Sequence, residues 1–338
     1  MTAPPELDVL AIGHAIVDVL AHADDGFIRE HGLRKGAMEL VDRDRAELLY
    51  GALGRAVEVS GGSAANTAVG VASLGGRAGF IGKVRDDQLG QIFIHDIRAA
   101  GVRFNTPPAP SDGDAPTARS LIVVTPDAQR TMSTYLGVAS TIPTADVRDE
   151  EVADARILYL EGYLMGIPDS MPAVNRAVDA AHRAGRQVAL TLSDSLWVEG
   201  QRQTFVDLIP HVDVLLGNEH EALALSGSDT VDEAIEVLAA QCRVLAVTRG
   251  AAGSIVVDEG RAITVPAHPV ADVVDTTGAG DLYAAGFLFG LTRDRSPVEC
   301  ARLGSLAASE VISHLGPRPE TSLKRLAEEA GLAGAPGS

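Results

Sequence analysis

The chain has 338 residues, and a composition of 46% hydrophobic and 22% charged residues is typical of a globular protein with a sizeable core. Its formal net charge of −18 argues against nucleic acid or an anionic membrane as a partner, because their phosphates would be repelled. A nucleotide can still bind where backbone amides and a metal ion hold its phosphates. The N-terminal residues lack the basic and apolar regions of a signal peptide, and the two cysteines form no disulfide or metal spacing, so we predict a cytoplasmic protein.

Short apolar runs alternate with longer amphipathic stretches along most of the chain. The runs that resemble strands begin at Leu7, Arg156, Gln187, Val212 and Arg243. Helical stretches begin at Pro172 and Thr230. Because continuous apolar strands separated by helices are typical of parallel sheets, the pattern predicts an α/β fold whose mostly parallel central sheet is covered on both faces.

Two segments interrupt this alternation. Residues from about 22 to 41 are polar and predicted to be irregular. Residues from about 102 to 135 contain a loop followed by "RSLIVVT" and "RTMSTYL", which we predict to be antiparallel strands joined by a turn. Such segments suit a small lid beside a large sheet. The tail 331–338 is rich in small residues and is expected to be flexible.

The stretch "DTTGAGD", residues 275–281, combines glycines with the start of a predicted helix. Gly278, Ala279 and Gly280 leave room for a ligand, and the first helical N–H groups are free to bind an anion. Asp281 could then accept a proton from a hydroxyl that attacks the bound phosphate. The plainer alternative is a turn whose aspartate caps the helix. Neither a phosphate-binding loop with lysine nor a dinucleotide fingerprint is present.

Polar residues near the start of the chain could bind a substrate that carries hydroxyl groups. In "SGGSAANTAVGVASLGG", Gly62 and Asn66 lie at the start of a helix of small residues, although such residues also suit close helix packing. Asp18 follows the first strand, where it could accept two hydrogen bonds from a diol or be an ordinary loop or capping carboxylate.

Two further stretches follow predicted strands, where open α/β sheets place their ligands. Asn218 and Glu221 could organise a hydrated Mg²⁺ ion or simply cap a helix. The sequence "TRGAAG", from Thr248 to Gly253, could be a hairpin turn or hold a nucleotide. The nine histidines show no zinc-binding spacing.

The order of these motifs resembles that of the ribokinase or PfkB-type family of carbohydrate and nucleoside kinases, over nearly the whole chain. The stretches "KGAMELVD", "RTMSTYLG", "YLEGYL" and "LTLSDS" are similar to those of a bacterial subgroup described as adenosine kinases. The resemblance implies a ribokinase-like three-layer α/β sandwich over residues 1–330, with a small β lid from segments of about 14–42 and 102–136. It also implies a monomer or homodimer that binds a small nucleoside or sugar.

The resemblance further implies ATP-dependent transfer of the γ-phosphoryl group to a sugar hydroxymethyl group, most closely the 5′-hydroxyl of adenosine. The implied roles are a base (Asp281), an anion hole (Gly278, Ala279, Gly280) and contacts to sugar hydroxyls (Asp18, Gly62, Asn66). The resemblance also implies that Asn218 and Glu221 organise Mg²⁺ through water, and that Thr248, Gly250 and Gly253 lie along the nucleotide. Many relatives also use K⁺. Two alternatives stay open: a kinase of a free sugar or sugar acid, and a non-catalytic binding protein.

Overall fold

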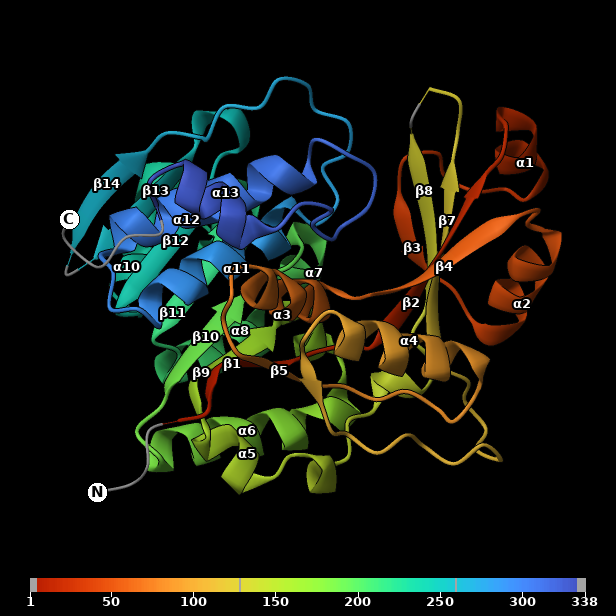
Figure 1. Ribbon diagram of the computed structural model, residues 1–338, viewed down its shortest axis with the longest axis horizontal. Helices are drawn as coiled ribbons and strands as arrows, with labels where there is room; N and C mark the ends of the chain where they lie inside the picture. Colours follow the sequence, from red (N-terminus) through yellow and green to blue (C-terminus); the bar gives the residue numbers. More distant parts are fainter. Residues whose placement is uncertain (1–4, 128, 259, 333–338) are drawn as a thin grey trace.

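The described part of the chain forms two separate β-sheets, one large and one small (Figure 1). This computed structural model describes residues 5–127, 129–258 and 260–332, so most of the predicted tail lies outside the described residues. No helix in these ranges has the length and hydropathy needed to cross a membrane. The predicted α/β class, with a mostly parallel central sheet and a separate small sheet, is confirmed.

The large sheet has the strand order β14-β13-β12-β11-β10-β9-β1-β5-β6, parallel except for β13 and β14. Its strands are β1 (Leu7–Ile12), β5 (Ala78–Ile81), β6 (Arg103–Phe104), β9 (Ala155–Glu161), β10 (Gln187–Thr191), β11 (Val214–Asn218), β12 (Val244–Thr248), β13 (Ser254–Asp258) and β14 (Arg261–Val265). In register, Val9 pairs with Ala78 on one side and Ile157 on the other. The strand order reverses beside β1, and the carboxyl ends of strands at such a reversal are where α/β sheets bind ligands.

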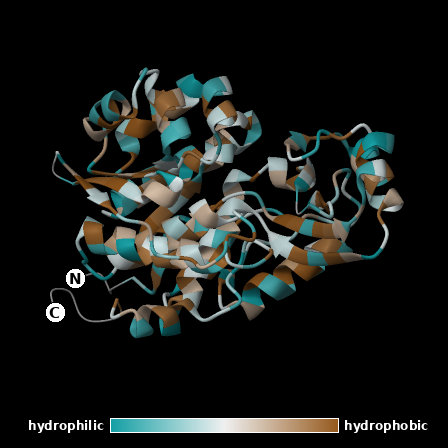
Figure 2. Cartoon of the chain, turned by 90° about the horizontal axis from the view of Figure 1, so that it is seen from above, coloured by the Kyte–Doolittle hydropathy of each residue, from teal (hydrophilic) through white to brown (hydrophobic). Residues whose placement is uncertain are grey.

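Helices cover both faces of the large sheet and complete three layers. One face packs against α3 (Ser63–Ser73), α4 (Gln88–Ala99), α11 (Ala279–Leu291), α12 (Pro297–Val311) and α13 (Leu323–Glu329). The other packs against α5 (Asp149–Ala153), α6 (Met171–Arg183), α7 (Ser195–Gly200), α8 (Arg202–Leu208), α9 (Glu219–Ser226) and α10 (Val231–Ala239). Figure 2 shows hydrophobic residues along the strands and hydrophilic ones on the outer helices. The continuous apolar runs of the sequence are therefore strands buried on both faces.

The small sheet has the order β3-β8-β7-β2-β4 and lies beside the large sheet (Figure 1). Its strands are β2 (Ile16–His22), β3 (Met38–Leu40), β4 (Ala56–Gly61), β7 (Ala118–Val124) and β8 (Arg130–Tyr135). The predicted strand pair is the antiparallel pair β7–β8. Strand β4 lies outside both segments that the sequence assigned to a lid, and the lid role stays a prediction.

Two short helices, α1 (Asp25–Glu30) and α2 (Arg43–Ala52), cover the outer face of the small sheet (Figure 1). The prediction that residues 22–41 are irregular was wrong, because they contain both α1 and β3. Asp24 begins α1 by accepting a hydrogen bond from the Phe27 backbone N–H. The opposite face of the small sheet, its inner face, faces the large sheet.

Glycines let three helices on one face of the large sheet approach closely. A Cβ atom on Gly70 of α3 would lie 2.5 Å from the Cβ of Ala285 in α11. One on Gly286 of α11 would lie 2.5 Å from the backbone of Leu303 in α12. Because neither the Leu303 backbone nor the Ala285 Cβ atom can move aside as the end of a flexible side chain can, these glycines fix the distances between the helices. They therefore hold the start of α11 beside the start of α3.

We expect Gly286→Ala to lower the free energy of unfolding by about 1–3 kcal/mol, the usual range for overpacking a core. The control is Gly51→Ala near the end of α2, where a new Cβ atom meets open space. That change should leave stability unchanged or raise it by up to about 1 kcal/mol, since alanine favours helix. Denaturant unfolding of both variants measures the difference, and equal stability would contradict the role assigned to Gly286.

Candidate active site

A pocket of ≈ 390 Å³ lies between the carboxyl ends of the large sheet's strands and the inner face of the small sheet. Most of the predicted site residues line it, namely Asp18, Gly62, Asn66, Asn218, Glu221, Thr248, Gly278, Gly280 and Asp281. The remaining three, Ala279, Gly250 and Gly253, are not among the described residues that line the pocket. Motifs from opposite ends of the sequence, from Asp18 to Asp281, therefore meet in one place.

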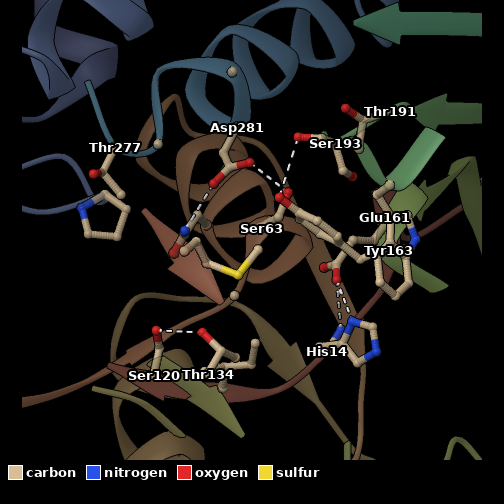
Figure 3. A pocket seen from close by; sticks show the side chains of 18 of the residues that line it. His14, Ser63, Ser120, Thr134, Glu161, Tyr163, Thr191, Ser193, Thr277 and Asp281 are labelled. Atoms are coloured by element: carbon tan, nitrogen blue, oxygen red, sulfur yellow. Dashed lines mark hydrogen bonds and ion pairs between the residues drawn. The ribbon is translucent and has the colours of Figure 1, made fainter. Parts of the chain in front are cut away.

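Asp281 lies in the first turn of α11, and two side chains of α3 hold its carboxylate (Figure 3). Ser63 Oγ donates to Oδ1 at 2.6 Å, and Asn66 Nδ2 donates to Oδ2 at 3.0 Å. Burial raises the pKa of Asp281 to about 6, against the lowering effect of the two donors. The N-cap of α11 is Gly278, so the alternative of a capping aspartate was wrong. The carboxylate instead points into the pocket.

The backbone at the start of α11 turns sharply at one glycine and lies open to the pocket at another. Gly278 has a φ of +80°, and a Cβ atom there would lie 2.7 Å from the backbone of Pro317. Nothing lies within 4 Å of a Cβ atom built on Gly280, so the backbone there is open to the pocket. Asp275 fixes the loop by accepting hydrogen bonds from the N–H groups of Thr277 and Gly316. Free N–H groups at the start of this long helix favour negative charge.

A sugar acid would need a cationic partner, and neither Arg119 nor Arg130 of the small sheet lines the pocket. Arg130 of β8 reaches across to the loop before α11, with Nη2 2.7 Å from Asp275 Oδ2. Arg119 of β7 lies over the ring of Tyr50 in α2, and α2 packs on the outer face of the small sheet. The described residues that line the pocket include no arginine or lysine. An acidic sugar would therefore find no cationic partner among them.

Asp18 of β2 is almost fully buried at the inner face of the small sheet. Burial raises its pKa to about 7, and the charges of Arg318 and Arg130 lower it. Gly61 makes room for it, because a Cβ atom there would lie 2.2 Å from Asp18 Oδ2. Its carboxyl group lines the pocket and is available to ligand hydroxyls.

Sequence reasoning missed Arg318, which follows α12 in a segment without a motif. Its Nε donates to Asn66 Oδ1 at 3.2 Å, and it also contacts Ser60 Oγ. Both ends of the Asn66 amide thus have partners within the protein, Arg318 at one end and Asp281 at the other. A direct contact from Asn66 to a sugar stays a prediction, and the structure adds a role in holding Asp281.

His14 and Glu161 form a second buried pair in the pocket that the sequence did not reveal. Glu161 Oε1 lies 2.7 Å from His14 Nδ1, and Oε2 accepts a hydrogen bond from the Ala64 N–H at 3.0 Å. Gly13 leaves space for this carboxylate, since a Cβ atom there would lie 2.2 Å from Oε2. The one available signal was a glutamate at the end of the apolar run "ILYLE". The pair joins β1, β9 and the start of α3.

Asn218 and Glu221 form a reciprocal capping box at the start of α9, so the plainer interpretation holds for their local structure. Both also line the pocket, and burial raises the pKa of Glu221 to about 7. Among the described residues, no three His, Cys, Asp or Glu side chains are placed to hold a metal. Two oxygen-bearing side chains suit Mg²⁺ that keeps most of its water and binds phosphate.

The segment "TRGAAG" is built as the turn of the β12–β13 hairpin, which was one of its two predicted structures. Gly253 has a φ of +88°, and a Cβ atom there would lie 2.1 Å from the Val265 carbonyl oxygen. Glycine is therefore required by the hairpin itself. Thr248 at the end of β12 lines the pocket, and the contacts of Gly250 and Gly253 with a nucleotide stay predictions.

Comparison with known proteins gives a family and several relatives for this chain. Residues 38–323 match the family described as pfkB family carbohydrate kinase. A fructokinase of Klebsiella pneumoniae is 33% identical over 270 residues, which cover 76% of this chain and 85% of that protein. Adenosine kinase 2 of Arabidopsis thaliana is 26% identical and covers 91% of this chain and 94% of its own length.

Solved structures include two with high similarity over nearly the whole chain. The adenosine kinase from Sinorhizobium meliloti is 52% identical with a TM-score of 0.90, covering 96% of this chain and 99% of its own. A probable sugar kinase from Rhizobium etli CFN 42 is 47% identical with a TM-score of 0.90, covering 97% of this chain and 99% of its own.

Proposed function

This chain belongs to the pfkB family of carbohydrate kinases, and from that premise we propose that it transfers the γ-phosphoryl group of ATP to the 5′-hydroxyl of adenosine. The observation that carries the chemistry is the Asp281 carboxylate, held by two donors at the open start of α11. The 52% identity to a bacterial adenosine kinase supports adenosine as the acceptor. Kinases of this family generally use ATP and Mg²⁺.

Asp281 acts as the general base. With its pKa near 6, it is largely ionised at neutral pH and accepts the proton of an acceptor hydroxyl as that oxygen attacks the phosphoryl group. The N–H groups from Gly278 to Gly280 stabilise the charge that develops on the transferred group. Asp18 orients the sugar hydroxyls. Asn218 and Glu221 would hold Mg²⁺ through water, and this ion neutralises phosphate charge when it is bound.

The walls of the pocket favour a nucleoside over a free sugar. Tyr163 and Trp197 stand edge to face with ring centroids 6.0 Å apart, and the inner face of the small sheet adds further apolar side chains. These apolar side chains of the small sheet are Ile16, Met38, Leu40, Ile122 and Met132. A purine buried among them gains apolar contact area that a sugar lacks. We expect the small sheet to act as a lid that closes over the acceptor and excludes water.

A kinase of a free sugar is the second candidate, favoured by the 33% identity to a fructokinase. A non-catalytic binding protein is disfavoured, because the base and its two donors are all in place. The K⁺ ion, the monomeric or homodimeric state and the cytoplasmic location stay predictions from the sequence.

Asp281→Asn keeps the shape of the side chain and removes the proton acceptor, so kcat should fall by about 10²–10⁴-fold. ATP binding should persist, because backbone groups hold the phosphates. Stability at neutral pH should not fall, since the change removes a partly buried charge. The control is Asp44→Asn, which changes an exposed carboxylate in the first turn of α2. A kcat for Asp281→Asn within about threefold of the unaltered protein would contradict the assignment of the base.

For the acceptor, we expect kcat/KM for adenosine to exceed that for ribose or fructose by at least about 10²-fold, equivalent to roughly 2.7 kcal/mol. Buried contacts to the purine ring provide this energy, and they also favour lid closure. A coupled assay of ADP release across these acceptors, with inosine and guanosine included, measures it. Trp197→Ala should reduce the ratio by impairing adenosine more than ribose. Higher activity with a free sugar would contradict the assignment of a nucleoside as the acceptor. The assignment of Asp281 as the general base would stand.

A further inference from the structure

The hydroxyl of Ser63 stands in the position of a nucleophile relative to Asp281. Its Oγ lies 2.6 Å from Asp281 Oδ1, and both side chains line the pocket (Figure 3). A general base must lie about 2.6–3.2 Å from the oxygen whose proton it takes. Any acceptor that uses Asp281 must place its hydroxyl at this same distance. Ser63 already does so.

A third group orients the base, which completes the arrangement of an activated nucleophile. Asn66 Nδ2 donates to Asp281 Oδ2 at 3.0 Å, and Arg318 Nε holds the other end of the amide at 3.2 Å. Asn66 follows Ser63 by three residues in α3, so the two side chains lie on one face of the helix. The carboxylate is thus fixed with one oxygen toward the Ser63 hydroxyl.

Neighbouring hydroxyls in the described residues have other partners. Thr67 Oγ1 donates to the backbone carbonyl of Asp281 at 3.1 Å and does not meet its carboxylate. Thr277 Oγ1 donates to Asp275 at 2.8 Å. Within the part of the chain that the structure describes, Ser63 is therefore the hydroxyl that the base can activate.

We infer that Ser63 is a site of self-phosphorylation, used when a nucleoside triphosphate with Mg²⁺ is bound and no acceptor is present. The bond from Ser63 Oγ to the γ-phosphorus forms, the bond from that phosphorus to the β-phosphate oxygen breaks, and the Ser63 proton passes to Asp281. The nucleoside diphosphate leaves. The inference rests on the proposed function, because it uses the same base and the same donor.

Phosphoserine at residue 63 would block the pocket. The modification adds about −1.5 to −2 charges at neutral pH. That charge would stand beside Asp281, whose proton-accepting oxygen the acceptor needs. A bound nucleoside would displace Ser63 from the base and compete with the modification. Self-phosphorylation therefore stops after one turnover and inactivates a chain that has nucleotide but no acceptor.

The test incubates the full chain with ATP and Mg²⁺ in the absence of nucleoside and locates phosphate by peptide mass spectrometry. We expect label at Ser63 to approach one phosphoryl group per chain, at a rate independent of protein concentration because the step is intramolecular. Kinase activity should fall in parallel, and added adenosine should suppress labelling. Ser63→Ala and Asp281→Asn should remain unlabelled. Thr67→Val removes a hydroxyl that meets the backbone carbonyls of Ser63 and Asp281 but not the Asp281 carboxylate, so this variant should still be labelled.

Unlabelled Ser63 in a preparation that phosphorylates adenosine would overturn the inference and leave the proposed function standing. Label that persists in Asp281→Asn, or that falls on other residues, would also overturn it. Labelled Ser63 in a preparation that phosphorylates no nucleoside would support the inference and contradict the proposed acceptor. A preparation that shows neither reaction would overturn both.

Discussion

The close approach of helices α3 and α11 is the constraint on which the site depends. Gly70 leaves no space for a side chain there, because a Cβ atom would lie 2.5 Å from Ala285 and 2.7 Å from Leu282. At this distance the first turns of the two helices meet, and side chains of α3 reach the carboxylate of Asp281. Packing in the core thus decides the position and the protonation of Asp281, the proposed base. A wider separation would leave Asp281 hydrated, with its pKa nearer the ordinary value.

The same pocket contains several carboxyl groups whose negative charges repel one another. Burial raises the pKa of Asp18 and of Glu221 to about 7, and the charge of Asp281 adds to both shifts. The charge of Arg318 offsets part of the rise in the pKa of Asp18, and burial lowers the pKa of Arg318 itself to about 10. Because these carboxyl groups bind protons more tightly in the folded state, their contribution to the unfolding free energy falls as pH rises from about 4 to about 7. The site reduces stability at neutral pH in order to hold a reactive carboxylate.

The sequence predicted the α/β class and the pocket residues that belong to motifs, because periodicity and glycine-rich turns act locally. It could not predict Arg318 or Glu161, since their partners lie far along the chain and no local pattern marks them. Helix α1 was missed because six residues are too few for a periodic signal, and Asp24 alone marks its start. Asn218 and Glu221 show why one motif supports two interpretations, because the same side chains cap a helix and line the pocket.

The pH dependence of kcat/KM for adenosine tests most directly the claim that burial and two donors prepare Asp281 as the base. We predict an acid limb with an apparent pKa of about 6, because the protonated carboxyl group cannot accept the acceptor's proton. Asn66→Ala removes a donor that lowers this pKa, so in that variant the limb should move to higher pH. A kcat/KM that stays constant from about pH 5 to about pH 8 would contradict the account.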